Sequence, residues 1–533
     1  MSEIDRRRFI GLAAAAAAGP ALGPYLTEEG WPGAPFAPDS PPVPGPVPGL
    51  RSLPGALVPA NADPPAFAFQ AWPGGTGALL ERLWRERGGS PFERTPTEVE
   101  PWSGPLPTDP DEIAFLPVHR QSALLAAGHL TSTELTRIYL ERMKRLDPEL
   151  LMAVTILEES ALEEAARADE ELRTGRRRGP LHGIPWGVKD LFSLRGHPTT
   201  WGHEGFRDRV IDEDAEVIVR LREAGAVLIA KLATGEFALG DRWYRGRTNN
   251  PWNPEQGSSG SSAGSASAVA AGCVAFAIGT ETQGSIVSPA RRCGISALRP
   301  TFGRVSRHGG MVLSWSMDKV GPMCRTIEDC ALVFDAIHGA SELDPASLTA
   351  PFRFDRDLRL EALRIGYTDS APEAFVEGLR ALGADPRPIP ELPSGGSNAL
   401  AVESAAAFDF HVGPEVERAL EAGEDPPTGR FLGARDVRAL DFVQSQRRRW
   451  AVMKEMDEVM QAWDLFLTGS GEVTLTNQTG HPAVIVPWTV SEGEHPQPVC
   501  TTIIGRLFAD DLILAVAHRW QESGEIHRMR PRL

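Results

Sequence analysis

The pattern of apolar and polar residues changes its character near residue 115. Beyond that point, short apolar runs alternate with amphipathic stretches, as strands and helices do when they follow one another. Thr131 and Glu134 form a capping-box signal ahead of apolar residues at helical spacing, and a second helix is expected over 158–175. The pattern predicts an α/β layer architecture with a largely buried sheet, whose expected strands cover 186–189, 226–231, 274–278, 363–367 and 483–487.

The chain before residue 115 has a different composition. MSEIDRRRFIGLAAAAAAGPALG places Arg6 and Arg7 before an alanine-rich run that is too short and too weakly apolar to span a bilayer stably. It resembles a twin-arginine export signal, and the alternative is an ordinary amphipathic helix. A proline-rich stretch follows, which cannot donate a ladder of hydrogen bonds. We therefore expect an export signal over 1–25, a proline-rich linker or N-terminal arm over 26–114, and one large domain over 115–533.

Composition narrows the classes of partner and site. The chain has 533 residues and a formal net charge of −17, which repels phosphate backbones and anionic membrane faces, so nucleic acid is not an expected partner. The five cysteines have no CxxC spacing, and the histidines form no HExxH motif or Cys/His cluster. We expect neither a disulfide framework nor a metal site.

The stretch with most chemical information runs from Gly257 to Thr301. A Gly/Ser run alone is typical of a flexible linker, but this run passes directly into an apolar segment and then into a second glycine turn. A linker would not be followed by sequence that must be buried. Glycines beside serines let backbone N–H groups approach a ligand closely, as in an oxyanion hole.

These motifs resemble those of the amidase signature family, GGSSGGS followed by GTDxGGSIRxPA. GIPWGVKD at 183–190 is similar to the lysine-bearing motif of that family, and segments 298–326, 476–487 and 503–518 are similar to its other landmarks, in the same order. The resemblance spans roughly residues 120–520. It implies an amidase signature fold, in which helices flank both faces of a large central mixed sheet, and it makes 115–533 the catalytic domain.

The resemblance also implies a Ser-Ser-Lys triad. Lys189 matches the catalytic lysine and Ser285 matches the nucleophile. Aligning NPWNP at 250–254 without gaps puts Ser261 on the bridging serine, which the family holds with a cis peptide, and Ser258 is the alternative. Ser262 matches the supporting serine next to the bridge.

The chemistry explains why these residue types are needed. A serine hydroxyl is a poor nucleophile until a base removes its proton, and a lysine is a base only when it is neutral. Because burial and nearby positive charge lower the pKa of a lysine, we expect Lys189 to be desolvated at a strand end. The backbone N–H groups of Thr282, Gln283, Gly284 and Ser285 are expected to hold the oxyanion. No cofactor is needed.

Four positions depart from the family pattern, and at one of them Ala263 replaces a glycine. Gln283 replaces the first glycine of the GGS element, Glu281 replaces an aspartate, and Val287 replaces an arginine. The lost arginine would have been a partner for the acid, a role that Arg291 or Arg292 could take. The triad itself is intact.

The sequence therefore predicts a periplasmic or otherwise exported amidase that cleaves C–N bonds of small linear or cyclic amides. After signal removal, no stable membrane insertion is expected. A homodimer is left open, and the natural substrate is not readable from these motifs. One rival is the nucleophile elbow GxSxG with Ser262 as nucleophile, which requires a strand immediately before it. Others are a catalytically silent binding protein on this scaffold and a glutamine-hydrolysing subunit of a tRNA-dependent amidotransferase.

Overall fold

The computed structural model describes residue 72 and residues 75–87, 90, 97–422, 434–469 and 471–533. They belong to the unit Pro59–Leu533; the other unit, Met1–Val58, is outside the described residues. The expected export signal over 1–25 and much of the proline-rich arm therefore lie outside the described part of the chain.

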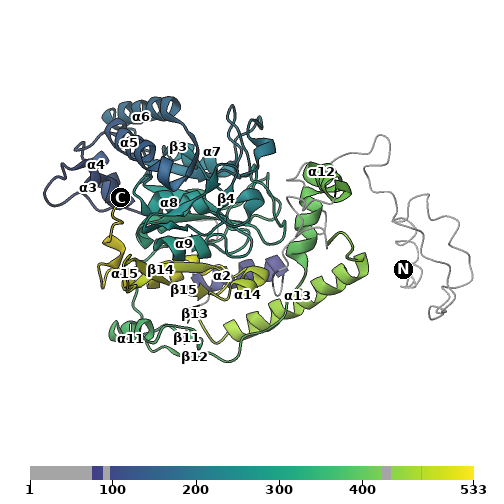
Figure 1. The fold of residues 1–533 in the computed structure, drawn as a ribbon. Coiled ribbons are helices and arrows are strands. Elements are labelled where there is room, and N and C mark those ends of the chain that lie inside the picture. The colour runs from purple at the N-terminus through teal and green to yellow at the C-terminus, as the bar shows by residue number, and fades with distance from the viewer. Residues whose placement is uncertain (1–71, 73–74, 88–89, 91–96, 423–433, 470) are drawn as a thin grey trace, which may run out of the picture. The chain divides into compact units, whose positions relative to one another are not determined.

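A large mixed sheet forms the centre of the fold (Figure 1). Within the described ranges it has eleven strands in the order β1-β3-β2-β8-β10-β9-β14-β15-β13-β11-β12. The strand β2 is parallel to β3 and β8, and β11 is parallel to β12 and β13, whereas the other neighbours are antiparallel. The strands are β1 (Ala153–Ile156), β2 (Pro185–Lys189), β3 (Val227–Leu232), β8 (Phe276–Glu281), β9 (Ser296–Arg299), β10 (Lys319–Cys324), β11 (Ile365–Tyr367), β12 (Arg387–Pro388), β13 (Leu465–Thr468), β14 (Ala483–Val490) and β15 (Pro498–Gly505).

The inner strands are apolar because both of their faces are covered. Every residue of β2 and β3 is buried, which explains why these strands read as continuous apolar runs rather than as alternating patterns. All five predicted strands are present, within a few residues of their expected bounds. The predicted α/β fold with a large central mixed sheet between helices is confirmed.

Helices flank the sheet and pack on one another. The predicted capping box is present, with the Thr131 hydroxyl accepting from Glu134 N and the Glu134 carboxylate accepting from Thr131 N. Contacts join α8 to α9 and α10 to α15. None of the described helices combines the length and apolar character that crossing a membrane requires. The principal helices are α3 (Pro110–Phe115), α4 (Val118–Ala126), α5 (Ser132–Leu150), α6 (Glu158–Arg173), α7 (Glu216–Glu223), α8 (Ala263–Ala270), α9 (Val287–Cys293), α10 (Ile327–Ile337), α11 (Glu373–Ala381), α12 (Ala399–Ala422), α13 (Ala439–Met460), α14 (Val473–Thr479) and α15 (Asp510–Gln521).

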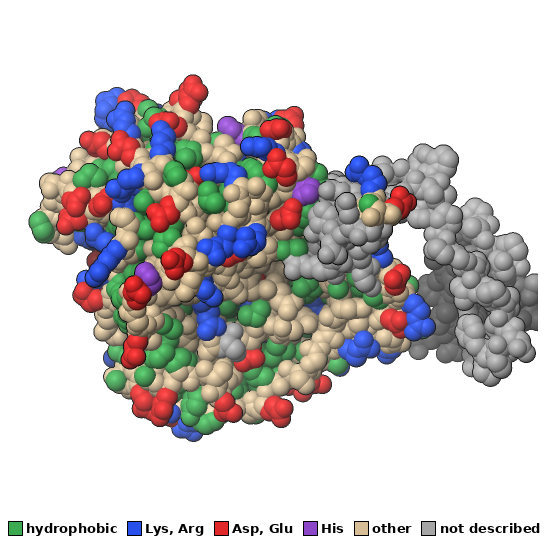
Figure 2. All heavy atoms as spheres, viewed as in Figure 1, with side chains coloured by type: hydrophobic (Ala, Val, Ile, Leu, Met, Phe, Trp, Pro, Cys, Tyr) green, Lys and Arg blue, Asp and Glu red, His purple; other side chains and the backbone are tan. Residues whose placement is uncertain are grey.

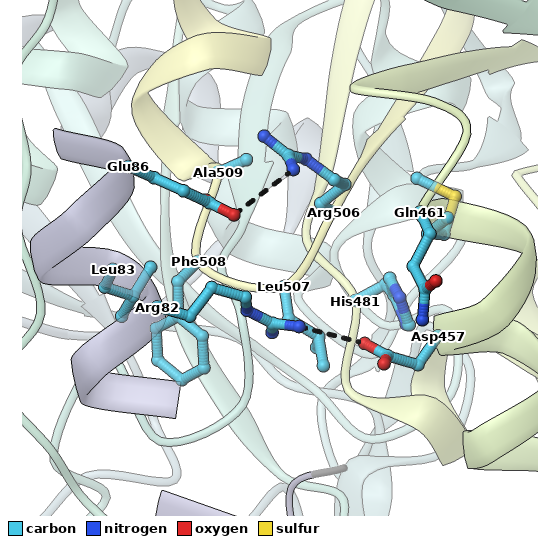
Figure 3. A pocket seen from close by; sticks show the side chains of 11 residues that line it. Arg82, Leu83, Glu86, Asp457, Gln461, His481, Arg506, Leu507, Phe508 and Ala509 are labelled. Atoms are coloured by element: carbon cyan, nitrogen blue, oxygen red, sulfur yellow. Dashed lines mark ion pairs between the residues drawn. The ribbon is translucent and has the colours of Figure 1, made fainter. Parts of the chain in front are cut away.

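Part of the N-terminal arm packs on this body. Trp72 is buried against Phe302 and Phe508, with its ring 4.9 Å from that of Phe508. The helix α2 (Gly75–Arg87) borders a cavity of about 160 Å³ beside α13, shown in Figure 3. Two ion pairs cross it, Arg82 with Asp457 at 3.5 Å and Glu86 with Arg506 at 3.7 Å. Apolar burial and ion pairs thus fix this segment of the arm.

Charged side chains of both signs are interspersed on the face seen in Figure 2. Arginines pair with acids at several exposed places, for example along α6 and at the start of α13. Exposed pairs of this kind contribute little to stability, because water and salt screen their charges.

Candidate active site

Lys189 is the last residue of β2 and its side chain is completely buried. Its Nζ donates hydrogen bonds to Ser261 Oγ and to Thr280 Oγ1, both at 2.8 Å. The strand order explains this meeting, because β8, which carries Thr280, lies directly beside β2. Two chain segments more than seventy residues from the lysine thus converge on one buried nitrogen.

Burial sets the protonation of this lysine. Desolvation lowers the pKa of Lys189 to about 7, against the opposing effect of the carboxylates of Asp318 and Glu281. The prediction of a desolvated lysine at a strand end is confirmed. The charges that act on it are negative rather than positive, so burial alone lowers its pKa. A substantial fraction of the side chain is then neutral near pH 7, as a base requires.

Of the serines in SSGSS, Ser261 contacts the lysine. The peptide bond between Gly260 and Ser261 is cis. The hydroxyl of Ser258 donates to the carbonyl of Ser259 at 2.9 Å instead. Ser262 Oγ lies between the backbone groups of Thr280, donating to the carbonyl at 3.1 Å and accepting from the N–H at 3.2 Å. The geometry thus favours Ser261 over Ser258 as the partner of Lys189, and gives Ser262 a supporting position.

The turn that presents Ser261 needs glycine at position 260. A Cβ there would lie 1.8 Å from the carbonyl oxygen of Gly240, so no side chain fits. On the other side of the turn, Gly235 N donates to the carbonyl of Ser261 at 3.2 Å, and Asp241 accepts from Ser259 N at 3.0 Å. Close backbone approach therefore holds the serine against the lysine.

Ser285 lies beside this pair, in the loop between β8 and α9. Its carbonyl accepts a hydrogen bond from Ser262 N at 3.1 Å, and its side chain is half-buried. Among the contacts of the described residues, its hydroxyl has no hydrogen-bond partner. The link between the hydroxyls of Ser261 and Ser285 therefore stays a prediction.

The same loop carries the predicted oxyanion groups. Gly284 has a φ of 97°, which favours glycine, whereas Gln283 avoids positive φ and its exposed side chain donates to Thr474 at 3.0 Å. Within the described part of the chain, the N–H groups of Gln283, Gly284 and Ser285 donate to no protein acceptor. The Thr282 hydroxyl donates to Asp318, which fixes the start of the loop. Because the N–H groups of Gln283, Gly284 and Ser285 have no acceptor among the described residues, they are available to a ligand.

The base of the loop is held by a buried carboxylate. Glu281 Oε2 accepts from the N–H groups of Ile286 and Val287, both at 2.8 Å. Its Oε1 accepts from Arg299 at 2.9 Å and from Asn477 at 2.7 Å. Burial by itself would raise the pKa of Glu281. The positive charge of Arg299 and the hydrogen bonds to the carboxylate outweigh it and lower the pKa to about 2.

The partner of Glu281 was expected to be Arg291 or Arg292, and this expectation is wrong. Arg292 instead donates to Gln256 at 3.2 Å. Arg299 belongs to β9, which is two strands away from β8, and it reaches the acid through the interior of the protein. Long-range strand pairing, which sequence spacing does not reveal, supplies the cation.

Comparison with known proteins decides the family. A family model described as Amidase matches residues 134–381. A glutamyl-tRNA(Gln) amidotransferase subunit from Moorella thermoacetica is 31% identical over 492 residues, covering 79% of this chain and 99% of the relative. The subunit of the same description from Methylococcus capsulatus is 35% identical over 493 residues, covering 78% and 99%. The chain belongs to the amidase family.

A solved structure agrees with this assignment. The native peptide amidase from Stenotrophomonas maltophilia superposes with a TM-score of 0.69 at 29% identity, covering 78% of this chain and 98% of that one. The present protein is thus an amide-hydrolysing enzyme with the fold of this family, and the rival reading as a catalytically silent binding protein loses its support.

The nucleophile-elbow reading is disfavoured within this amidase. A strand does precede the serines, since β7 covers Asn253–Gly257. Among the strands that the structure describes, it pairs only with β6 (Asn249–Asn250), in a separate two-stranded ribbon. Ser262 is completely buried and its hydroxyl is bonded to the backbone of Thr280. Neither feature fits an exposed nucleophile at the edge of a central sheet.

Two contributors to the amidase site were missed by sequence reasoning. Thr280 supplies the second hydroxyl to Lys189. It stands only five residues before Ser285, in the segment that resembles the family motif, yet it was not among the predicted site residues. Asp318 accepts from Thr282 and from Leu313 N at 2.8 Å, so it ties the oxyanion loop to the segment before β10. A polar residue at the end of a buried strand was the available signal for Thr280.

Proposed function

We propose that this enzyme hydrolyses the C–N bond of small linear or cyclic amides through an acyl-enzyme on Ser285, with Ser261 as proton relay and Lys189 as base. The observation that carries the proposal is the buried 2.8 Å contact between Lys189 Nζ and Ser261 Oγ. A lysine with a pKa of about 7 is able to take a proton at neutral pH.

The proton path follows from these contacts. Neutral Lys189 accepts the proton of Ser261 while Ser261 accepts that of Ser285, and Ser285 Oγ forms a bond to the amide carbonyl carbon. The relay then returns the proton to the departing amine nitrogen as the C–N bond breaks. Water, activated by the same relay, attacks the ester of Ser285 and releases the carboxylic acid. The enzyme returns to its starting protonation state.

The negative charge on the carbonyl oxygen needs donors in the tetrahedral state. The N–H groups of Thr282, Gln283, Gly284 and Ser285 are the proposed donors. The N–H groups of Gln283, Gly284 and Ser285 donate to no acceptor among the described residues, which supports this role. The hydrogen bonds that Glu281 accepts from the end of the loop support it as well. Removing one such donor costs about 2.7–4 kcal/mol of transition-state stabilisation in other enzymes.

A small fluorophosphonate tests the nucleophile without knowledge of the natural substrate. The purified full-length protein is treated, its intact mass is measured, and the modified residue is mapped. We expect one adduct on Ser285, which is absent in Ser285→Ala and strongly slowed in Lys189→Ala. Ser258→Ala serves as the matched control and is expected to react like the unaltered protein.

Two results would contradict the triad. An adduct on Ser262 or Ser258 would overturn the assignment of the nucleophile, and undiminished labelling of a folded Lys189→Ala variant would overturn the assignment of the base. Circular dichroism of each variant separates loss of activation from loss of fold. Amide turnover on a panel of C-terminal peptide amides and aryl amides would then define the substrate.

Glutamine hydrolysis is the second candidate function, and the names of the curated relatives favour it. The net charge of −17 and the signal-like N-terminus argue against a protein that works with tRNA. Ammonia release distinguishes the two, because a glutaminase releases it from free glutamine, whereas the proposed amidase releases it from peptide amides and leaves glutamine intact.

Export is also a proposal. Its support is the Arg6-Arg7 pattern ahead of an alanine-rich run. In a bacterial host with a twin-arginine pathway, the unaltered chain is expected in the periplasmic fraction, and Arg6→Lys/Arg7→Lys in the cytoplasm. Arg8→Lys is the matched control. Equal distribution of all three proteins would overturn the signal assignment.

A further inference from the structure

A second cavity, of about 580 Å³, opens on another side of the fold. The C-terminal tail runs beside α3 and α4 there (Figure 1), and Arg530 lies over the ring of Phe115 at 5.0 Å. The starts of α4 and α10 and the end of α15 complete the lining. Six arginines line this cavity: Arg120, Arg325, Arg356, Arg519, Arg528 and Arg530.

Most of these arginines have no carboxylate partner among the described residues. Arg356 pairs with Glu328 at 2.6 Å and Arg528 with Glu525 at 3.0 Å, but the other four make no ion pair with any residue that the structure describes. Arg120 and Arg530 instead lie over aromatic rings. The remaining acidic residues of the lining stand at its exposed rim: Glu100, Asp357 and Glu522.

Arg325 gives the cavity a buried donor. This side chain is only 7% exposed, and it donates to the carbonyls of Val274 and Leu116 at 3.3 and 2.7 Å. Its Nε is buried and makes no hydrogen bond to a described residue. A guanidinium that is nine-tenths buried without a counter-ion is costly unless an anion compensates it.

Histidines add further polar groups to the same wall. His518 is 7% exposed, and its ring makes no hydrogen bond within the described part of the chain, although it packs edge-on against Phe354 at 5.4 Å. His119 and His527 also line the cavity. No group of three or more His, Cys, Asp or Glu among the residues described has the geometry of a metal site. Anions, rather than metal ions, match this set of donors.

The cavity is separate from the catalytic centre. Arg325 directly follows β10, whereas Asp318, which anchors the oxyanion loop, directly precedes that strand. At about 3.3 Å per residue, the strand puts roughly 20 Å between its two ends. A ligand in the cavity would therefore not occupy the place of the substrate amide.

We propose that this cavity binds a compact organic or inorganic polyanion through carboxylate or phosphate groups. Planar guanidinium groups bind both groups with two parallel hydrogen bonds, which explains the preference for arginine over lysine in the lining. The volume suits a small molecule. The net charge of the chain is −17, which would repel an anionic ligand, so the attraction would have to come from these arginines themselves.

Calorimetric titration of the full-length protein tests this proposal. Inorganic phosphate and citrate are the probes, at pH 7 and low ionic strength, because they separate a phosphate ligand from a carboxylate ligand. The test variant is Arg519→Gln/Arg530→Gln, which leaves buried Arg325 in place. Its matched control is Arg359→Gln/Arg532→Gln, which removes the same charge from exposed arginines outside the cavity.

We expect saturable binding of at least one probe at millimolar concentration. The test variant should weaken it by about tenfold or more, because two charge-assisted contacts are lost, and the control should leave it unchanged. Fluorophosphonate labelling should be the same in both variants, which verifies their fold. Absence of saturable binding of either probe, or equal weakening by both double variants, would overturn the proposal.

Discussion

Two buried lysines on neighbouring strands differ in what they can do. Lys189 ends β2 and Lys231 lies in β3, where it pairs in register with Val188, and both side chains are completely buried. Lys231 forms an ion pair with Asp190 at 2.7 Å and donates to Pro198 O and Thr199 Oγ1, each at 2.6 Å. Lys189 has only the hydroxyls of Ser261 and Thr280 as partners among the described residues.

The two lysines are equally buried, so the difference in their roles comes from the groups that they contact. Desolvation lowers the pKa of both lysines, but for Lys231 the adjacent Asp190 opposes it by a direct charge and hydrogen bond. An ammonium held by a carboxylate and two further acceptors is a structural ion. A lysine between two hydroxyls has the partners that the proposed proton transfer needs, because a hydroxyl both donates and accepts.

Replacing Lys189 should produce the largest effect. Lys189→Met removes the base, so we expect the rate of fluorophosphonate labelling and amide turnover to fall by about 10⁴-fold or more. The free energy of unfolding should change by less than about 2 kcal/mol, because only two hydroxyl contacts are lost. Labelling kinetics and chemical denaturation measure the two quantities. Labelling at the unaltered rate would remove Lys189 from the mechanism.

Replacing Lys231 should instead lower the stability of the protein and leave its reactivity nearly unchanged. Lys231→Met leaves the carboxylate of Asp190 buried without its cation, which is expected to cost about 3–5 kcal/mol of stability. Labelling of the molecules that remain folded should change by no more than a few-fold. Lys231→Met/Asp190→Asn removes both charges and should recover part of the lost stability. A stable variant that no longer reacts with the fluorophosphonate would contradict the structural role.

The same contrast explains how far the sequence could predict this protein. The strands were predictable because a buried strand reads as an apolar run, as in β3. Lys189 and Ser261 were identified through motif resemblance and an ungapped alignment, and the fold brings them together. Nothing in the sequence distinguished Lys189 from Lys231 by burial, since both end up with no exposed surface.

The residues that sequence reasoning missed act over long distances. Arg299 reaches Glu281 from two strands away, and Asn477 reaches it from α14. Such contacts depend on strand order, and short motifs do not encode it. The arm segment at Trp72 shows the same limit, because its partners Phe302 and Phe508 are more than 200 residues away.

A smaller effect should follow from the second hydroxyl on Lys189. Thr280→Val keeps the shape of the side chain but removes the acceptor 2.8 Å from Nζ, which leaves one lysine proton without a partner. We expect labelling to slow by about tenfold, which corresponds to the net free energy of about one ordinary hydrogen bond, ~1.4 kcal/mol. Thr280→Ser restores the hydroxyl and should react nearly like the unaltered enzyme. Equal rates for Val and Ser would show that Thr280 has no part in positioning the lysine.

The smallest effect is the pH dependence of the unaltered enzyme. Lys189 is a base only when neutral, and its pKa of about 7 lies below that of an unfolded lysine, so the labelling rate should rise as the pH increases through 7. Between pH 6 and pH 7 the neutral fraction, and with it the rate, increases about fivefold. Asp318→Asn removes a carboxylate that favours the ammonium form of Lys189, so the rise of the labelling rate should occur at lower pH. Lys231→Met should leave the pH of this rise unchanged, because Lys231 does not hold the reacting proton. A rate that is constant from pH 6 to pH 8, or that falls over this range, would show that a neutral Lys189 is not what limits activation of Ser285.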